Sequence, residues 1–107
     1  MILNVWRPIH AVQDNHLGFC KWDSLVKEDA VEANIKPDGS WNSLQAWKYR
    51  KDQKWFYLSE QKPHEAFVFM QHDSRAPDGH GINVPHASFN LEKDADKPPT
   101  RMSFEAR

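Results

Sequence analysis

Short apolar segments separated by polar turns containing proline or glycine run along the whole chain. Segments of this length, rich in aromatic and β-branched residues, are typical of β-strands. Residues 44–49 and 55–59 are expected to form two such strands around a polar hairpin loop at 50–54. Residues 65–71 would also suit a short helix. The segments that we predict as strands are 2–6 (closed by Pro8), 44–49, 55–59, 65–71, 84–89 and 101–107.

The last of these segments, 101–107, has the clearest alternation of polar and apolar side chains. Successive side chains of a strand point to opposite faces, so Arg101, Ser103, Glu105 and Arg107 are predicted to share one face. Met102, Phe104 and Ala106 then share the other face. One side of this strand is therefore polar and charged, and the opposite side is apolar.

Only residues 23–34 resemble a helix, with Ser24 available as its cap. Lys36-Pro37-Asp38-Gly39-Ser40 predicts a turn, and 75–81 predicts a loop. Many short strands with turns between them and one short helix indicate a mainly β domain, either a sandwich or a barrel. The chain has no internal repeat and no linker, so residues 1–107 are predicted to belong to a single domain.

The composition suits part of a larger hydrophobic core. At 107 residues the chain is at most one domain, near the size at which a single core is just adequate. Hydrophobic residues make up 39% and charged residues 27%, which is poor for a self-sufficient core. Aromatic residues make up 12%, which argues against a disordered tail. Core-forming strands whose partner surfaces are missing would show this mixture.

Charge and cysteine content limit the possible partners and the cellular setting. The formal net charge is −1, so nothing directs the chain toward nucleic acid or an anionic membrane. The longest apolar run, 66–70, is too short to cross a bilayer. The single cysteine, Cys20, excludes an internal disulfide and a cysteine-based zinc cluster. We therefore expect a reducing, cytoplasmic setting.

The candidate chemistry lies in the last quarter of the chain. His86 follows Val84-Pro85, Arg101 comes fifteen residues later, and Ser103 follows it. A guanidinium and a hydroxyl on one strand face suit a carboxylate, and an imidazole a loop earlier can bind a metal that the same small acid chelates from its other end. Judged by spacing alone, such a pattern more often reflects a solvent-exposed charged strand face and an ordinary loop histidine than a metal and carboxylate site.

A set of ordered motifs carries a resemblance across nearly the whole chain. The motifs are Asn4-Val5-Trp6-Arg7-Pro8-Ile9, Val12-Gln13-Asp14, His16-Leu17-Gly18-Phe19-Cys20, Trp55-Phe56-Tyr57-Leu58-Ser59-Glu60, Pro63-His64-Glu65-Ala66-Phe67-Val68-Phe69, His72-Asp73-Ser74, Pro85-His86-Ala87-Ser88-Phe89 and 101–107. In this order and at these intervals the sequence resembles the fungal hydroxylase/desaturase family, which includes AsaB-like, gibberellin desaturase-like and cephamycin 7α-methoxylation component-like proteins. The first motif and the Trp55–Ser59 block are the most specific.

The resemblance implies an iron(II)/2-oxoglutarate-type oxygenase of secondary metabolism. The implied fold is a double-stranded β-helix (jelly roll, cupin-like), of which this chain would form a part. In such an enzyme His86 would be a ligand of the non-haem iron, and Arg101 and Ser103 would bind the 2-oxoglutarate cofactor. Arg7 would either form a structural salt bridge, for example with Glu65, or contact substrate.

The same resemblance shows that part of the iron site is absent from this sequence. Such sites need two histidines and one carboxylate, and the family supplies His-x-Asp or His-x-Glu upstream of the Asn-Val-Trp-Arg-Pro segment, which here starts at Asn4. None of the six histidines provides the motif: His10 leads to Val12, His16 to Gly18, His64 to Ala66, His72 to Ser74, His80 to Ile82 and His86 to Ser88. We interpret the chain as the C-terminal part of an incomplete domain, lacking an N-terminal region and a short C-terminal strand.

Three hypotheses about function follow. The first is a hydroxylase or desaturase acting on a small-molecule secondary metabolite, for which this chain alone would bind iron weakly and show no turnover. The second is a non-catalytic remnant or small-molecule-binding jelly-roll module, which the missing His-x-Asp favours for the chain by itself. The third is self-association, in which two copies complete each other's barrel.

Overall fold

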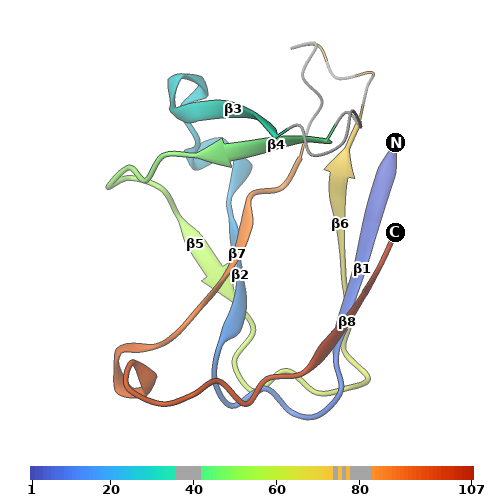
Figure 1. Ribbon diagram of the computed structural model, residues 1–107, viewed down its shortest axis with the longest axis vertical. Helices are drawn as coiled ribbons and strands as arrows, with labels where there is room; N and C mark the ends of the chain where they lie inside the picture. Colours follow the sequence, from blue (N-terminus) through green and yellow to red (C-terminus); the bar gives the residue numbers. More distant parts are fainter. Residues whose placement is uncertain (36–41, 74, 76, 78–82) are drawn as a thin grey trace.

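The computed structural model describes residues 1–35, 42–73, 75, 77 and 83–107. Figure 1 shows two sheets that run side by side, with a two-stranded hairpin across one end. In chain order the elements are β1 (Ile2–Pro8), β2 (His16–Cys20), the 3-10 helices η1 (Trp22–Ser24) and η2 (Lys27–Asp29), β3 (Ala30–Ile35), β4 (Asn42–Trp47), β5 (Trp55–Tyr57), β6 (Phe67–His72), β7 (His86–Phe89), the 3-10 helix η3 (Glu92–Asp94) and β8 (Ser103–Ala106).

Both three-stranded sheets are antiparallel and have an early strand at their centre. One sheet has the order β6-β1-β8 and the other β5-β2-β7, while β3 pairs with β4. In the first sheet Trp6 lies opposite both Phe67 and Glu105. In the second sheet Phe19 lies opposite both Phe56 and His86. Directly opposed residues project to the same face, so each row of three continues across its sheet.

The alternation along β1 determines which face of its sheet is buried. Asn4, Trp6 and Pro8 are buried, whereas Val5 and Arg7 between them are exposed. The buried set faces the second sheet, where Phe19 contacts Phe67 and Phe69 with ring centroids 4.6 and 5.0 Å apart. These residues belong to one core cluster that contains Trp6, Val12, Leu17, Phe19 and Phe69, with Phe67 and Val84 packed against it. Burying each large apolar side chain stabilises the fold by about 1.5–3 kcal/mol.

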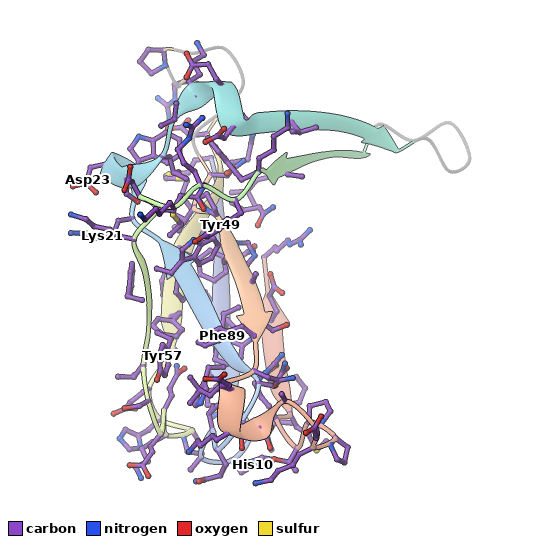
Figure 2. The ribbon with its side chains drawn as sticks, turned by 90° about the vertical axis from the view of Figure 1, so that its left-hand side faces the viewer. His10, Lys21, Asp23, Tyr49, Tyr57 and Phe89 are labelled. Carbon is purple, nitrogen blue, oxygen red and sulfur yellow. The ribbon has the colours of Figure 1, made fainter. Side chains whose placement is uncertain are left out.

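Strand β2 is buried at all five positions because it is central in its sheet and covered on both faces. Leu17 and Phe19 belong to the core, while His16 projects to the opposite face. There the His16 ring packs against Tyr57 and Phe89, with centroids 4.8 and 5.9 Å away. Figure 2 labels Tyr57 and Phe89 on the strands that flank β2. Burial lowers the pKa of His16.

The β3–β4 hairpin extends away from the two sheets (Figure 2). Its base is fixed by Arg50, whose Nε and Nη2 donate hydrogen bonds to the two carboxylate oxygens of Asp29 at 2.5 and 2.8 Å. The rings of Trp22 and Trp47 pack edge to face nearby, with centroids 6.2 Å apart. The hairpin is therefore attached to the sheets through its base.

The predicted mainly β class is confirmed, but several element predictions were wrong. Residues 23–34 form no α-helix: two 3-10 turns lead into β3, because β4 pairs with the backbone of 30–35 and Val26 is extended. The predicted hairpin of 44–49 with 55–59 is also wrong, because β4 pairs with β3 and β5 pairs with β2. Pro8 lies within β1 rather than closing it after Trp6. The predicted turn at 36–40 and most of the loop at 75–81 lie outside the described residues.

Candidate functional site

A cavity of about 430 Å³ lies between the two sheets, next to the core. It is lined by Trp6, Leu17, Phe69, His86, Ala87, Ser88, Arg101, Ser103 and Glu105. The three side chains singled out in the sequence, His86, Arg101 and Ser103, therefore share one cavity. Strand β7 brings His86 to it, and β8 with the residues just before it brings Arg101 and Ser103.

Arg101 is half-buried, and the described hydrogen-bond partners of its guanidinium are all neutral oxygen atoms. Its Nε donates to the Asn15 carbonyl at 2.5 Å and to Asn15 Oδ1 at 3.2 Å, and its Nη2 donates to the same Oδ1 at 2.8 Å. Its Nη1 donates to Ser103 Oγ at 2.6 Å. The guanidinium carbon also lies 5.5 Å from the centre of the Trp6 ring. The guanidinium is thus held on three sides with its charge not neutralised by these partners.

Ser103 completes the polar side of the cavity. Its hydroxyl oxygen accepts the hydrogen bond from Arg101, so the hydroxyl hydrogen can be donated to a ligand. An arginine and a hydroxyl donor placed next to each other match the two oxygen atoms of a carboxylate.

His86 presents one ring nitrogen as a potential metal ligand. Its Nδ1 lies 2.8 Å from the Val84 carbonyl, which can only accept, so Nδ1 carries the proton and Nε2 has a free electron pair. The ring packs between Phe69 and Phe19, with centroids 4.6 and 6.2 Å away. A carbonyl that fixes the tautomer and aromatic rings that fix the orientation are the usual support of a metal-binding histidine.

Glu105 is a fourth polar group in the cavity, and sequence alternation correctly placed it on the face of Arg101 and Ser103. Its Oε1 accepts a hydrogen bond of 2.7 Å from Nδ2 of Asn4, which is fully buried. The same Asn4 amide donates to Gln71 Oε1 at 2.6 Å. The contribution of Asn4 could not be predicted, because a single asparagine in an apolar strand gives no pattern that identifies its partners.

The described residues fit part of an iron site. Within residues 1–35, 42–73, 75, 77 and 83–107, no group of three or more histidine, cysteine, aspartate or glutamate side chains is arranged to hold a metal. Of the two histidines and one carboxylate that such a site requires, the cavity lining offers the imidazole of His86 as one candidate ligand. Arg101 and Ser103 could hold a carboxylate in the same cavity, and bound iron would supply the oxidative chemistry.

Arg7 does not form the salt bridge with Glu65 that the sequence suggested. Its Nη1 donates to the carbonyl of Pro63 at 3.1 Å on the protein surface. Glu65, proposed as its salt-bridge partner, instead accepts a hydrogen bond of 2.9 Å from the backbone amide of Lys62. The arginine thus fastens the segment before β6 to β1.

A family model described as an oxidoreductase/YMDC permease-like domain matches residues 1–107. The chain belongs to this family. None of the helices in the described part of the structure is long and apolar enough to span a membrane.

The predicted resemblance to fungal hydroxylases and desaturases is confirmed by individual relatives. The chain is 33% identical over 108 residues to the alpha-ketoglutarate-dependent dioxygenase phiK from Fungal sp., covering 99% of the chain and 39% of that protein. It is 29% identical over 119 residues to the hydroxylase/desaturase asaB from Aspergillus flavus, covering 99% of the chain and 52% of that protein. The chain thus spans between about two fifths and one half of the length of these relatives.

A solved structure has the same fold. The iron and alpha-ketoglutarate-dependent endoperoxidase NvfI matches with a TM-score of 0.75 and 22% sequence identity, over 96% of this chain and 38% of that protein. This likeness confirms the predicted jelly-roll architecture. The two sheets of this chain face each other without closing into a barrel.

Proposed function

We propose that this chain is part of an iron(II)- and 2-oxoglutarate-dependent oxidoreductase that hydroxylates or desaturates a small secondary metabolite in the cytoplasm. In this proposal residues 1–107 form one portion of a single oxygenase domain. Arg101 and Ser103 bind the distal carboxylate of 2-oxoglutarate, and His86 is one iron ligand. The observation that carries the proposal is the arrangement of Arg101, whose hydrogen bonds hold it in place without neutralising it.

The charge of Arg101 favours an anion in the cavity. No carboxylate of the described residues lies within 4.0 Å of its guanidinium, unlike that of Arg50, which pairs with Asp29. A half-buried cation that has lost part of its hydration and has only neutral partners gains from binding an anion. Two of its five N–H groups have no described partner, and together with the Ser103 hydroxyl they match a carboxylate.

A second residue of the cavity, His86, supports the identity of the acid. His86 lines the same cavity with Nε2 available, so an acid held by Arg101 can direct its 2-oxo end toward a metal on this imidazole. A volume of about 430 Å³ lies within the range of small-molecule sites. When bound, iron supplies the oxidative chemistry with dioxygen. The residues of this chain bind the acid, orient it and limit its access to water.

Comparing two acids tests the carboxylate site. We expect the chain to bind 2-oxoglutarate about tenfold more tightly than 2-oxopentanoate, which lacks the distal carboxylate, because a hydrogen-bonded charge pair is worth about 1.5 kcal/mol or more. Arg101→Gln should abolish this preference. Arg107→Gln is the control, since it removes a cation just after β8 that does not line the cavity and lies 3.9 Å from Glu105 at its edge. Equal affinities of the unsubstituted chain for both acids would contradict the proposal.

A second candidate function is supported by the incomplete set of metal ligands. With no group of three metal-ligating side chains in the described part of the chain, the cavity can serve as a binding site without iron chemistry. Succinate release in the presence of iron(II), 2-oxoglutarate and dioxygen distinguishes catalysis by this chain from binding alone. We expect dicarboxylate binding without succinate release; measurable release would show that the chain alone is catalytic.

A further inference from the structure

We propose that Asn15 is a positioning residue of the carboxylate site, which orients the Arg101 guanidinium without neutralising it. This inference rests on the proposed function of the cavity. Asn15 lies in the turn before β2, outside the residues that line the cavity, and acts through Arg101.

Asn15 contacts the guanidinium with two different oxygen atoms. Its backbone carbonyl accepts from Arg101 Nε at 2.5 Å, and its side-chain Oδ1 accepts from Nε and Nη2 at 3.2 and 2.8 Å. The amide nitrogen of the same side chain donates to Asn90 Oδ1 at 3.4 Å, which is consistent with Oδ1 facing the arginine. Two acceptors on one residue fix both the position and the plane of the guanidinium.

The backbone of Asn15 makes this double contact possible. Its φ angle of 48° lies in the left-handed region, which asparagine adopts more readily than most residues. Glycine adopts this conformation without steric cost but has no side-chain acceptor. Replacement by glycine therefore removes the Oδ1 contacts while leaving the turn unstrained.

Asn15 is uncharged and therefore leaves the charge of the Arg101 guanidinium available. The preceding residue, Asp14, is charged but binds the backbone around residue 100 instead. The carboxylate of Asp14 accepts hydrogen bonds from the Thr100 amide at 2.8 Å, the Thr100 hydroxyl at 2.7 Å and the Arg101 amide at 3.2 Å. Asp14 therefore fixes the backbone that leads into β8, and Asn15 fixes the guanidinium. Asp14 and Asn15 thus position Arg101 together, and neither forms a described ion pair with the Arg101 guanidinium.

The preference for 2-oxoglutarate over 2-oxopentanoate is the decisive measurement. In Asn15→Gly we expect this preference to fall about threefold, because Arg101 keeps its charge and its bond to the residue-15 carbonyl but loses the Oδ1 contacts. The affinity for 2-oxopentanoate should stay unchanged, because only the distal carboxylate reaches Arg101. Asn15→Asp keeps the acceptor but adds a charge; it should also weaken 2-oxoglutarate binding while keeping Arg101 in place. Glu60→Gly is the matched control, because Glu60 has a similar φ angle of 52° and does not line the cavity.

The NMR signal of the Arg101 Nε–H group gives an independent readout without ligand. We expect this signal to shift in Asn15→Gly and to remain in place in Glu60→Gly. Equal loss of affinity for both acids in Asn15→Gly, or unchanged preference, would overturn the inference. If the unsubstituted chain shows no preference for 2-oxoglutarate over 2-oxopentanoate, the proposed function is wrong. In that case the NMR signal alone decides the positioning role, and an Arg101 Nε–H signal unaffected by Asn15→Gly would overturn it.

Discussion

The imidazole of His86 packs against the ring of Phe69, with centroids 4.6 Å apart and planes inclined by 58°. The two residues belong to different sheets, since His86 begins β7 and Phe69 lies in β6. Phe69 is also part of the core cluster. The candidate metal ligand is therefore positioned by the same packing that joins the two sheets, and changes in the core should reach the site.

Two adjacent residues of β6 allow this packing to be tested. Phe69 is 8% exposed and Val68 is 63% exposed. We expect Phe69→Ala to lower the free energy of unfolding by about 3 kcal/mol or more, because it leaves a cavity in the core. Val68→Ala should change it by less than about 1 kcal/mol. Urea denaturation measures both values, and similar effects of the two substitutions would contradict the packing described here.

His86 should account for the metal binding of this chain. Mn²⁺ or Co²⁺, as air-stable substitutes for iron(II), should bind weakly and broaden NMR signals near residue 86, because one imidazole leaves most of the coordination sphere to water. His86→Gln should remove this broadening. His64→Gln, at an exposed histidine outside the cavity, is the control. Persistent broadening at the cavity in His86→Gln would argue against His86 as the ligand.

His16 should make the fold less stable in mild acid. Burial lowers its pKa below 6.5 in the folded chain, whereas the carboxylates of Asp94 and Asp14 act in the opposite direction and Lys93 in the same direction. The unfolded chain therefore binds the proton more readily, and the free energy of unfolding should fall as the pH drops below about 6.5. His16→Phe keeps an aromatic ring against Tyr57 and Phe89 and should reduce this fall, whereas His10→Phe should not. Denaturation midpoints between about pH 7.5 and about pH 5 test this.

The Asp29–Arg50 pair should contribute to stability only above strongly acid pH. The hydrogen bonds from Arg50 hold the pKa of Asp29 below its usual value of 3.8. A carboxyl group whose pKa is lower in the folded state contributes stability above its unfolded pKa, and this contribution is lost as the pH falls through the folded pKa. Asp29→Asn should therefore lower the free energy of unfolding at neutral pH and reduce its fall at acid pH, whereas Glu28→Gln should do neither. Denaturation at several pH values measures this, and a fall at acid pH that is unchanged in Asp29→Asn would exclude this role for the pair.

Local patterns in the sequence predicted much of the sandwich. Alternation in 101–107 placed Arg101, Ser103 and Glu105 on one face, and all three line the cavity. The apolar segments near residues 2, 67 and 86 also became strands. These predictions succeeded because the strands have one buried and one exposed face, which gives the period of two on which sequence reasoning depends.

The features that were missed depend on long-range contacts. Strand β2 is buried on both faces, so His16 to Cys20 shows no alternation of polar and apolar residues. Residues 30–35 form a strand because they pair with β4, and the local signals that suggested a helix do not reveal this pairing. The contact of Asn15 with Arg101 joins residues 86 positions apart. Such contacts follow from the assembled fold and have no local signature.

An NMR titration of the chain with 2-oxoglutarate probes the carboxylate site itself. We expect the amide signals of Arg101, Ser103 and His86 to shift together and to saturate, and we expect Arg101→Gln to abolish these shifts. Shifts confined to the β3–β4 hairpin, or shifts that persist in Arg101→Gln, would show that this cavity is not a site for the carboxylate of a 2-oxo acid.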